Sequence, residues 1–257
     1  MKLLTKEQFR LADAYTIKTE PISSVDLMER AATSCVDVIT KFTDEKDLIC
    51  ILCGPGNNGG DGLAIARMLA ESGKNVSVIL TDKSDKLSPD AATNFQRLQK
   101  TSVNFFYLTD TQLPFEKITV WIDAIFGTGL NKVVEKNIAD LIHKVNSTGA
   151  TIFSIDLPSG LFADKHTPAS AGVIHASTTL TFQQLKRCML YAENAHRIGE
   201  VKVLDIGLDE HYIESLTSTH ELVDRSMIKK SLKPRKRFSH KGNFGHALLI
   251  GGSYGKA

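Results

Sequence analysis

The residues best suited to ligand chemistry lie in one short segment, residues 53–62, with the sequence Cys-Gly-Pro-Gly-Asn-Asn-Gly-Gly-Asp-Gly. Glycine lets the backbone adopt positive φ angles and approach a bound group closely, and a following helix directs free N–H groups at a ligand. Two amides and a carboxylate add polar groups that a plain turn does not need. The segment therefore predicts a ligand-binding loop, and phosphate is the ligand that this geometry favours.

The flanking residues predict a strand before this loop and a helix after it. Residues 48–53 form a continuous apolar run, which is typical of a strand buried on both faces of a parallel sheet. After the loop, Leu63, Ala66 and Leu69 recur at helical spacing until Gly73 offers a C-cap. Strand, glycine loop and helix together open a nucleotide-binding βαβ unit.

Two more predicted strands end in an acid followed by glycine. Residues 118–122 lead into Asp123 and a Gly-Thr-Gly turn, and residues 151–155 lead into Asp156 and Leu-Pro-Ser-Gly. The carboxyl ends of parallel strands line the ligand crevice of an open α/β sheet, so the three loops should meet at one site. Taken singly, each Asp is equally well a helix N-cap or a turn former.

Other interpretations of the glycine loop remain open at this point. Gly54, Gly56 and Gly59 satisfy G-x-G-x-x-G, and Asp82 follows the next apolar run, where the ribose-binding acid of a dehydrogenase would lie. A Walker A loop is excluded, because no Lys-Ser or Lys-Thr closes the glycine run. A glycine-rich turn without a ligand is the remaining alternative.

Three motifs in order resemble the NAD(P)H-hydrate epimerase family, also called the YjeF N-terminal domain. They are G-P-G-N-N-G-G-D-G-L at 54–63, D-A-I-F-G-T-G-L at 123–130 and D-L-P-S-G-L at 156–161. The resemblance covers roughly residues 1–215. It implies a Rossmann-like α/β fold and the interconversion of the R and S forms of hydrated NADH and NADPH (NADHX and NADPHX), as part of nucleotide repair.

The resemblance also implies roles for individual residues. Potassium would be held by Asn58, Asp123 and Ser159, and Asp156 and Lys186 would be catalytic. Lys186 is alternatively a solvated surface lysine beside Arg187. Substrate contacts are implied for Asn57, Asn58, Gly59, Gly60, Asp61, Gly127, Thr128, Gly129, Leu130, Asn131, Lys132, Val133 and Asp156.

The chemistry explains why these residue types would be needed. Inverting C6 of the reduced ring is expected to proceed by C–O cleavage assisted by N1, with water re-attacking the other face of the iminium ion. A carboxylate such as Asp156 would stabilise the cation and transfer the proton. Amide, carboxylate and hydroxyl oxygens suit a hard cation, which would fix the loops.

The alternation of apolar runs and helical patterns predicts a largely parallel sheet with helices on both faces. We expect helices at 5–19 and 24–42 before the first strand. Strands are expected at 48–53, 76–80, 103–108, 118–123, 151–156, 173–181 and 200–204. The epimerase domain should span 1–217.

Residues 218–257 resemble the start of an ADP- or ATP-dependent NAD(P)H-hydrate dehydratase domain of ribokinase-like fold, with a strand at 247–250. We expect this part to be truncated, so that dehydratase (lyase) activity would require the full second domain. Its basic segment 233–241 is expected to be a linker. A nucleic-acid site would combine such charges with a stacking surface, and this segment has none.

Composition agrees with a cytoplasmic enzyme. The 257-residue chain is 42% hydrophobic and 23% charged, with a net charge of +2, which favours neither nucleic acid nor membrane as a partner. The four cysteines give no disulfide framework, and Cys50 and Cys53 are expected to be buried thiols. An apolar stripe of Leu27, Ala31, Cys35, Val38 and Phe42 is either core or the interface of a homodimer.

Overall fold

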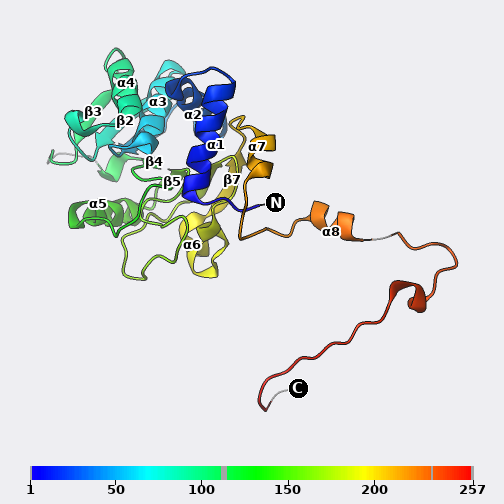
Figure 1. Ribbon diagram of the computed structural model, residues 1–257. Helices are drawn as coiled ribbons and strands as arrows, with labels where there is room; N and C mark the ends of the chain where they lie inside the picture. The colour runs from blue at the N-terminus through cyan, green and yellow to red at the C-terminus, as the bar shows by residue number, and fades with distance from the viewer. Residues whose placement is uncertain (1, 111–114, 233, 256–257) are drawn as a thin grey trace. The chain divides into compact units, whose positions relative to one another are not determined.

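The computed structural model describes residues 2–110, 115–232 and 234–255. Its main element is a seven-stranded parallel sheet in the order β3-β2-β1-β4-β5-β6-β7 (Figure 1). The strands are β1 Leu48–Cys53, β2 Asn75–Leu80, β3 Asn104–Tyr107, β4 Val120–Ala124, β5 Thr151–Ile155, β6 Thr178–Phe182 and β7 Glu200–Leu204. The predicted α/β fold with a parallel sheet is confirmed.

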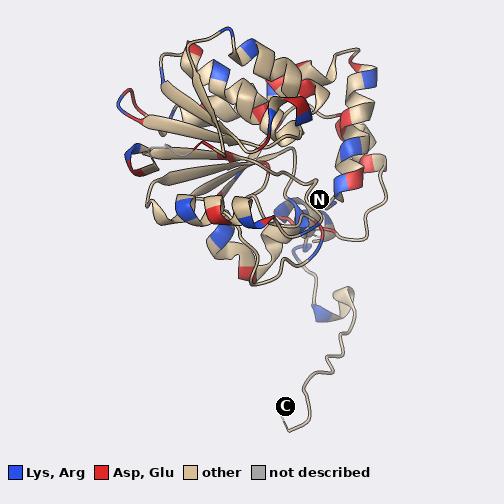
Figure 2. Cartoon of the chain, turned by 90° about the vertical axis from the view of Figure 1, so that its left-hand side faces the viewer, with Lys and Arg blue, Asp and Glu red and all other residues tan. Residues whose placement is uncertain are grey.

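Helices cover both faces of the sheet, as predicted. The α-helices are α1 Lys6–Thr19, α2 Ser24–Ile39, α3 Asn57–Glu71, α4 Pro89–Leu98, α5 Lys136–Ser147, α6 Ala195–Ile198, α7 Glu210–Ser215 and α8 Arg225–Ser231. Helices α2, α3 and α4 pack on one face and α5 on the other (Figure 1). The central strands are buried on both sides and the edge strands β3 and β7 only partly. The sheet is mostly free of charge, whereas Lys, Arg, Asp and Glu are interspersed along the outer helices (Figure 2).

The order of the strands fixes where a ligand crevice lies. β1 is central and pairs with β2 on one side and β4 on the other. The chain first adds β2 and β3 on one side of β1 and then crosses to add β4 to β7 on the other side. In open α/β sheets ligands bind at such a switch point, beyond the carboxyl ends of the strands. The loops that follow β1 and β4 therefore flank the predicted crevice.

Helix α1 packs against residues near the end of the same compact unit. Its N-cap Thr5 and Gln8 form a capping box. Phe9 and Ala12 pack with Ile206 and Ile213, which come from beside and within α7. The N-terminal helix is thus held by residues about two hundred positions later in the chain.

The structure divides into two compact units, Lys2–His220 and a C-terminal unit that begins at Glu221. The second unit holds α8 and a short 3₁₀ turn at Lys241–Phe244, and Arg235 lies over the Phe244 ring. The strand expected at 247–250 is absent, and Leu249 is 93% exposed. A strand needs a neighbour to complete its hydrogen bonds, and none of the described residues supplies one.

Two further expectations are corrected by the structure. The strand expected at 173–181 begins only at Thr178, because Ile174 and Ala176 pack against the α5 face as a loop instead of joining the ladder. Helix α3 begins at Asn57, so the predicted loop shrinks to residues 54–56. Its glycines do not use positive φ angles there: Gly54 and Gly59 instead permit close backbone packing.

The cysteines are buried free thiols, as predicted. None of the helices that the structure describes is both long and apolar enough to cross a bilayer.

Candidate active site

Asp123, at the end of β4, forms the centre of a buried hydrogen-bond network. Its Oδ2 accepts from Ser154 Oγ and from the Ser159 backbone N–H, both at 2.8 Å, and its Oδ1 accepts from Ser159 Oγ at 2.5 Å. Burial raises the pKa of Asp123, and these hydrogen bonds act in the opposite direction. We call Asp123, Ser154 and Ser159 the Asp123 network.

Two predicted ligand residues meet at the loop after β4. Ser159 Oγ accepts from the Phe126 N–H at 2.9 Å. A methyl group added at the next residue, Gly127, would lie 3.1 Å from Asn58 Oδ1. The buried Nδ2 of Asn58 has no hydrogen-bond partner among the described residues. Oxygen-bearing side chains from two other loops therefore adjoin the Phe126–Gly127 segment.

Asp156 and Lys186 form a buried ion pair. Asp156 Oδ1 lies 2.7 Å from Lys186 Nζ, and the lysine side chain is only 3% exposed. Lys186 Nζ also donates to the Phe182 carbonyl at 2.7 Å and lies 4.5 Å from the centre of the Phe9 ring. The surface-lysine interpretation is therefore wrong, because this ammonium is enclosed by a carboxylate, a carbonyl and an aromatic face.

The backbone at Asp156 is unusual. Its φ is +62°, in the left-handed region that non-glycine residues seldom adopt. This conformation directs the side chain toward the loop after β4, where Asp156 Oδ2 accepts from the Thr128 N–H at 3.3 Å. Backbone strain of this kind is often found where a side chain must be aimed accurately.

A cavity of about 160 Å³ adjoins this ion pair. Its lining includes Asp13 and Ile17 from α1, Asn57 and Asp61 from α3, and Phe182, whose carbonyl binds Lys186. Asp156 does not line the cavity, and the contact between the cavity and the ion pair is made by Phe182. We call this space the α1 cavity.

Asp13 and Asp61, two acids that line the α1 cavity, have raised pKa values. Burial, assisted by the negative charge of Asp156, raises the pKa of Asp13 to about 6, while Lys186 opposes the shift. Burial is also the main cause of the raised pKa of Asp61, followed by the charges of Asp156, Asp13 and Asp90. Asp13 and Asp61 therefore both hold a proton more tightly than an exposed carboxyl group does.

The start of α3 brings free backbone donors to the same region. Its N-cap Gly56 provides no side-chain cap, so the first N–H groups of the helix remain available to a ligand. Asn57 Oδ1 accepts from Ser88 Oγ at 2.7 Å, and Pro55 O accepts from the Ser88 N–H at 2.7 Å. The loop is therefore fixed to the start of α4.

The loop that contains the other predicted substrate residues extends outward. Gly127 and Thr128 lie beside Asp156, whereas Asn131, Lys132 and Val133 are exposed. Lys165 Nζ donates to the Asn131 carbonyl at 3.0 Å. Only the first part of this loop adjoins the ion pair.

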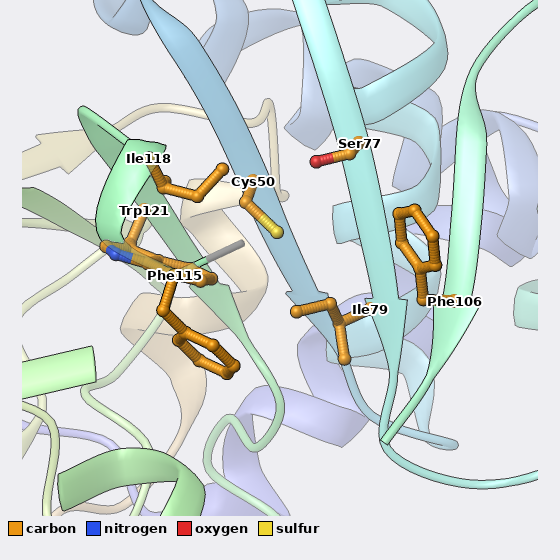
Figure 3. Close-up of a pocket in the computed structure, with 7 residues that line it drawn as sticks. All are labelled: Cys50, Ser77, Ile79, Phe106, Phe115, Ile118 and Trp121. Carbon is orange, nitrogen blue, oxygen red and sulfur yellow. The ribbon is translucent and has the colours of Figure 1, made fainter. Parts of the chain in front are cut away.

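A second cavity, of about 10 Å³, lies on the α5 face of the sheet. Cys50 and Ser77 come from neighbouring strands, and Phe115 and Trp121 lie beside them (Figure 3). Trp121 Nε1 is buried with no hydrogen-bond partner among the described residues. The space suits about one water molecule and no substrate.

The sequence matches a known family over most of this architecture. Residues 24–188 match the family model described as YjeF-related protein N-terminus. The chain belongs to the YjeF N-terminal family. The match includes Asn58, Asp123, Asp156 and Lys186, but it begins after α1.

Relatives of this YjeF-family chain fall into two lengths. The bifunctional NAD(P)H-hydrate repair enzymes Nnr of Escherichia coli and Coxiella burnetii are 33% and 32% identical over 90% and 91% of this chain, but over only 44% and 47% of their own. The chain thus spans about half the length of these relatives. The NAD(P)H-hydrate epimerase of Weissella koreensis is 32% identical over 80% of this chain and 91% of its own length.

The fold is shared with a solved structure. The crystal structure of yeast YNL200c superposes with a TM-score of 0.67, at 20% identity, over 93% of this chain and 97% of that protein. This likeness supports the Rossmann-like fold of the YjeF N-terminal unit.

The predicted metal and catalytic residues of this YjeF unit come together at two adjoining places, the Asp123 network and the Asp156–Lys186 pair, whereas Asn131, Lys132 and Val133 lie outside both. Asp82 instead pairs with Lys86 at 2.9 Å. Of the predicted apolar stripe, Leu27, Ala31 and Cys35 are buried in the core, Val38 is half-buried, and Phe42 is 55% exposed.

Asp13 is the titratable lining residue of α1 that the sequence did not single out. Its signal was a carboxylate on the apolar face of an amphipathic helix, next to the buried Ala12 and four residues after the buried Phe9.

Proposed function

We propose that this protein is an NAD(P)H-hydrate epimerase, which interconverts the R and S forms of NADHX and NADPHX at C6. The observation that carries the proposal is the enclosed Asp156–Lys186 pair at the carboxyl ends of a doubly wound sheet. Family membership and the short Weissella koreensis epimerase, matched over most of its length, support it.

The residues supply what this isomerisation needs. Loss of the C6 hydroxyl leaves a cationic ring, and the carboxylate of Asp156 is suited to stabilise that charge and to accept a proton from the incoming water. Lys186 holds the carboxylate in one orientation from its own enclosed position. The free N–H groups at the start of α3 suit the pyrophosphate of the dinucleotide.

We include potassium as the bound cation. Asn58, Asp123 and Ser159 offer amide, carboxylate and hydroxyl oxygens, a set that suits a hard cation, and Asn58 Oδ1 and Ser159 Oγ both adjoin the Phe126–Gly127 segment. When bound, potassium would offset the buried charge of Asp123 and hold the loops after β1 and β4. In the part of the chain that the structure describes, no three His, Cys, Asp or Glu side chains are grouped to hold a metal.

A melting experiment tests the cation. The wild type in KCl should melt at a higher temperature than in choline chloride of equal ionic strength, because a ligand that binds only the folded state stabilises it. Asn58→Ala should lose this difference. Equal melting temperatures of the wild type in both salts would remove potassium from the proposal.

Epimerisation itself is tested directly. Purified (R)-NADHX should be converted to (S)-NADHX far faster than it is spontaneously, followed by chromatography, and Asp156→Ala should abolish the acceleration. A wild-type rate equal to the spontaneous rate would favour a non-catalytic nucleotide-binding module, and hydride transfer with NAD(P) would favour a dehydrogenase. Dehydratase activity, cytoplasmic location and a homodimer remain predictions.

A further inference from the structure

Inverting C6 needs a proton donor as well as an acceptor, and the Asp156–Lys186 pair supplies only the acceptor. The departing hydroxyl needs a proton on one face of the ring, and the incoming water must lose one on the other face. This need for two groups rests on the proposed epimerase function. Asp156, paired with Lys186, suits the acceptor role.

Lys186 is not free to be the donor. An ammonium has three N–H bonds, and Lys186 Nζ is surrounded by Asp156 Oδ1, the Phe182 carbonyl and the Phe9 ring. A substrate hydroxyl would have to displace one of these contacts. The donor should therefore be another acid near the ion pair.

Helix α1 places Asp13 at this position. The ring of Phe9 covers Lys186, and Asp13 and Ile17 follow at intervals of four residues, so all three share one face of the helix. Asp13 and Ile17 both line the α1 cavity, and Phe9 contacts the ion pair that adjoins it. This face of α1 thus runs from the ion pair into the cavity.

The charges around Asp13 favour a retained proton. The groups that face it from the packed elements are Asp61 of α3, Asp156 and Lys186, and Asp90 at the start of α4 lies farther along the same cavity. Asp13, Asp61 and Asp156 thus contribute three carboxyl groups, and Lys186 is the one ammonium among these facing groups. Burial and this surplus of negative charge raise the pKa of Asp13 to about 6, close to the working range of a general acid.

We propose that Asp13 is a second catalytic residue of the epimerase, which gives its proton to the C6 hydroxyl as it leaves. The C6–O bond breaks with its electron pair on oxygen, the oxygen takes the Asp13 proton and departs as water, and the N1 lone pair forms the C6=N1 bond. Water then adds to the opposite face of C6: its electron pair forms the new C–O bond, the C6=N1 π pair returns to N1 as its lone pair, and a proton of the water goes to Asp156. Proton exchange with solvent then deprotonates Asp156 and reprotonates Asp13, which restores both groups with no change in oxidation state.

The test compares Asp13→Asn with the wild type over a range of pH, using (R)-NADHX and subtracting the spontaneous rate. Because Asp13 must be protonated, wild-type kcat should fall as pH rises above about 6. Asp13→Asn should lose about 10²-fold in kcat with KM nearly unchanged, and should lack this alkaline fall. Asp13→Glu should recover part of the rate.

Controls separate this role from others. Asp37→Asn, an exposed position on α2, should behave as the wild type, and Asp13→Asn should keep the wild-type circular dichroism spectrum. A normal kcat in Asp13→Asn, a change in KM alone, or a persistent alkaline fall that disappears only in Asp61→Asn would each overturn the proposal for Asp13. Those results would leave the epimerase intact, whereas an inactive wild type would overturn both.

Discussion

The Asp123 network and the α1 cavity hold buried or partly buried acids at adjoining parts of one sheet. The two regions differ in the hydrogen bonds and charges that surround these acids. Among the described residues, Asp123 receives hydrogen bonds from the hydroxyls of Ser154 and Ser159 and from the backbone N–H groups of Ile125 and Ser159. Asp13 and Asp61 face the cavity with raised pKa values, and the nearest ammonium is already paired with Asp156.

The difference separates a group that holds structure from groups that can exchange protons. A carboxylate with several fixed donors is stabilised in one place, and removing it leaves each donor unpaired. Acids that compete for protons in a cavity can titrate near neutral pH, which is what acid–base chemistry requires. Substitutions in the two regions should therefore affect different properties.

The largest effect is expected from Asp156→Asn, with a loss of about 10³-fold in kcat, because the amide cannot accept the proton of the incoming water. Asparagine tolerates the left-handed φ of +62° at this position, so the fold should be kept. Chromatography of (R)- and (S)-NADHX measures the rate. Full activity in the asparagine variant would contradict the role of Asp156.

Asp123→Ala should instead reduce stability, by about 3 kcal/mol, because it leaves Ser154 Oγ and the Ser159 N–H unpaired in the interior, while Ser159 Oγ keeps only the Phe126 carbonyl at 3.3 Å. Ser154→Ala removes only one donor and should cost about 1 kcal/mol. Urea denaturation followed by circular dichroism measures both. Equal stability of the two variants would show that Asp123 is not the centre of its network.

Asp13 should destabilise the protein as the pH rises. Its pKa is raised from an ordinary value of 3.8 to about 6 in the folded protein, so the folded state binds this proton more tightly than the unfolded chain does. The resulting stabilisation is complete below about pH 4 and is lost as pH rises through about 6, and it amounts to about 2–3 kcal/mol.

Asp13→Asn removes this dependence. The free energy of unfolding of Asp13→Asn should therefore rise relative to wild type between pH 4 and pH 8 by about 2–3 kcal/mol. Denaturation at several pH values measures it, with Asp37→Asn as the matched control. A constant difference between Asp13→Asn and wild type would mean that the cavity does not hold this proton.

The smallest effect concerns the loop that connects the two regions. A methyl group at Gly59 would lie 1.8 Å from the Gly54 carbonyl oxygen, whereas one at Gly56 meets nothing within 4 Å. Gly59→Ala should cost about 2 kcal/mol of stability, and Gly56→Ala under about 1 kcal/mol. Thermal or urea denaturation distinguishes them, and equal losses would contradict the close approach of α3 to the loop.

Much of the fold follows from local patterns in the sequence. Apolar runs such as 48–53 predicted buried parallel strands, and the acids at their ends predicted that Asp156 would meet the loop after β4. The apolar residues at 173–177 were wrongly expected to belong to a strand, because Ile174 and Ala176 pack on α5 and do not join the hydrogen-bonded ladder. Burial alone does not distinguish those two arrangements.

The site was less predictable wherever burial depends on distant residues. Lys186 is a lysine beside Arg187 in sequence, and only the approach of Asp156 and Phe9 encloses it. Asp13 is an ordinary helix carboxylate until Phe182 and Asp61 form the cavity around it. Such contacts join residues far apart in the sequence, and local hydrophobic periodicity carries no information about them.

The packing of α1 against the region around α7 also has a consequence during synthesis. Phe9 and Ala12 are made early, but their partners Ile206 and Ile213 leave the ribosome about two hundred residues later. At about 5–20 residues per second, α1 waits roughly 10–40 s before it can dock. Over that interval the nascent chain exposes the apolar face of an amphipathic helix that chaperones could hold. The α1 cavity is completed only once the last strands of the sheet have been translated.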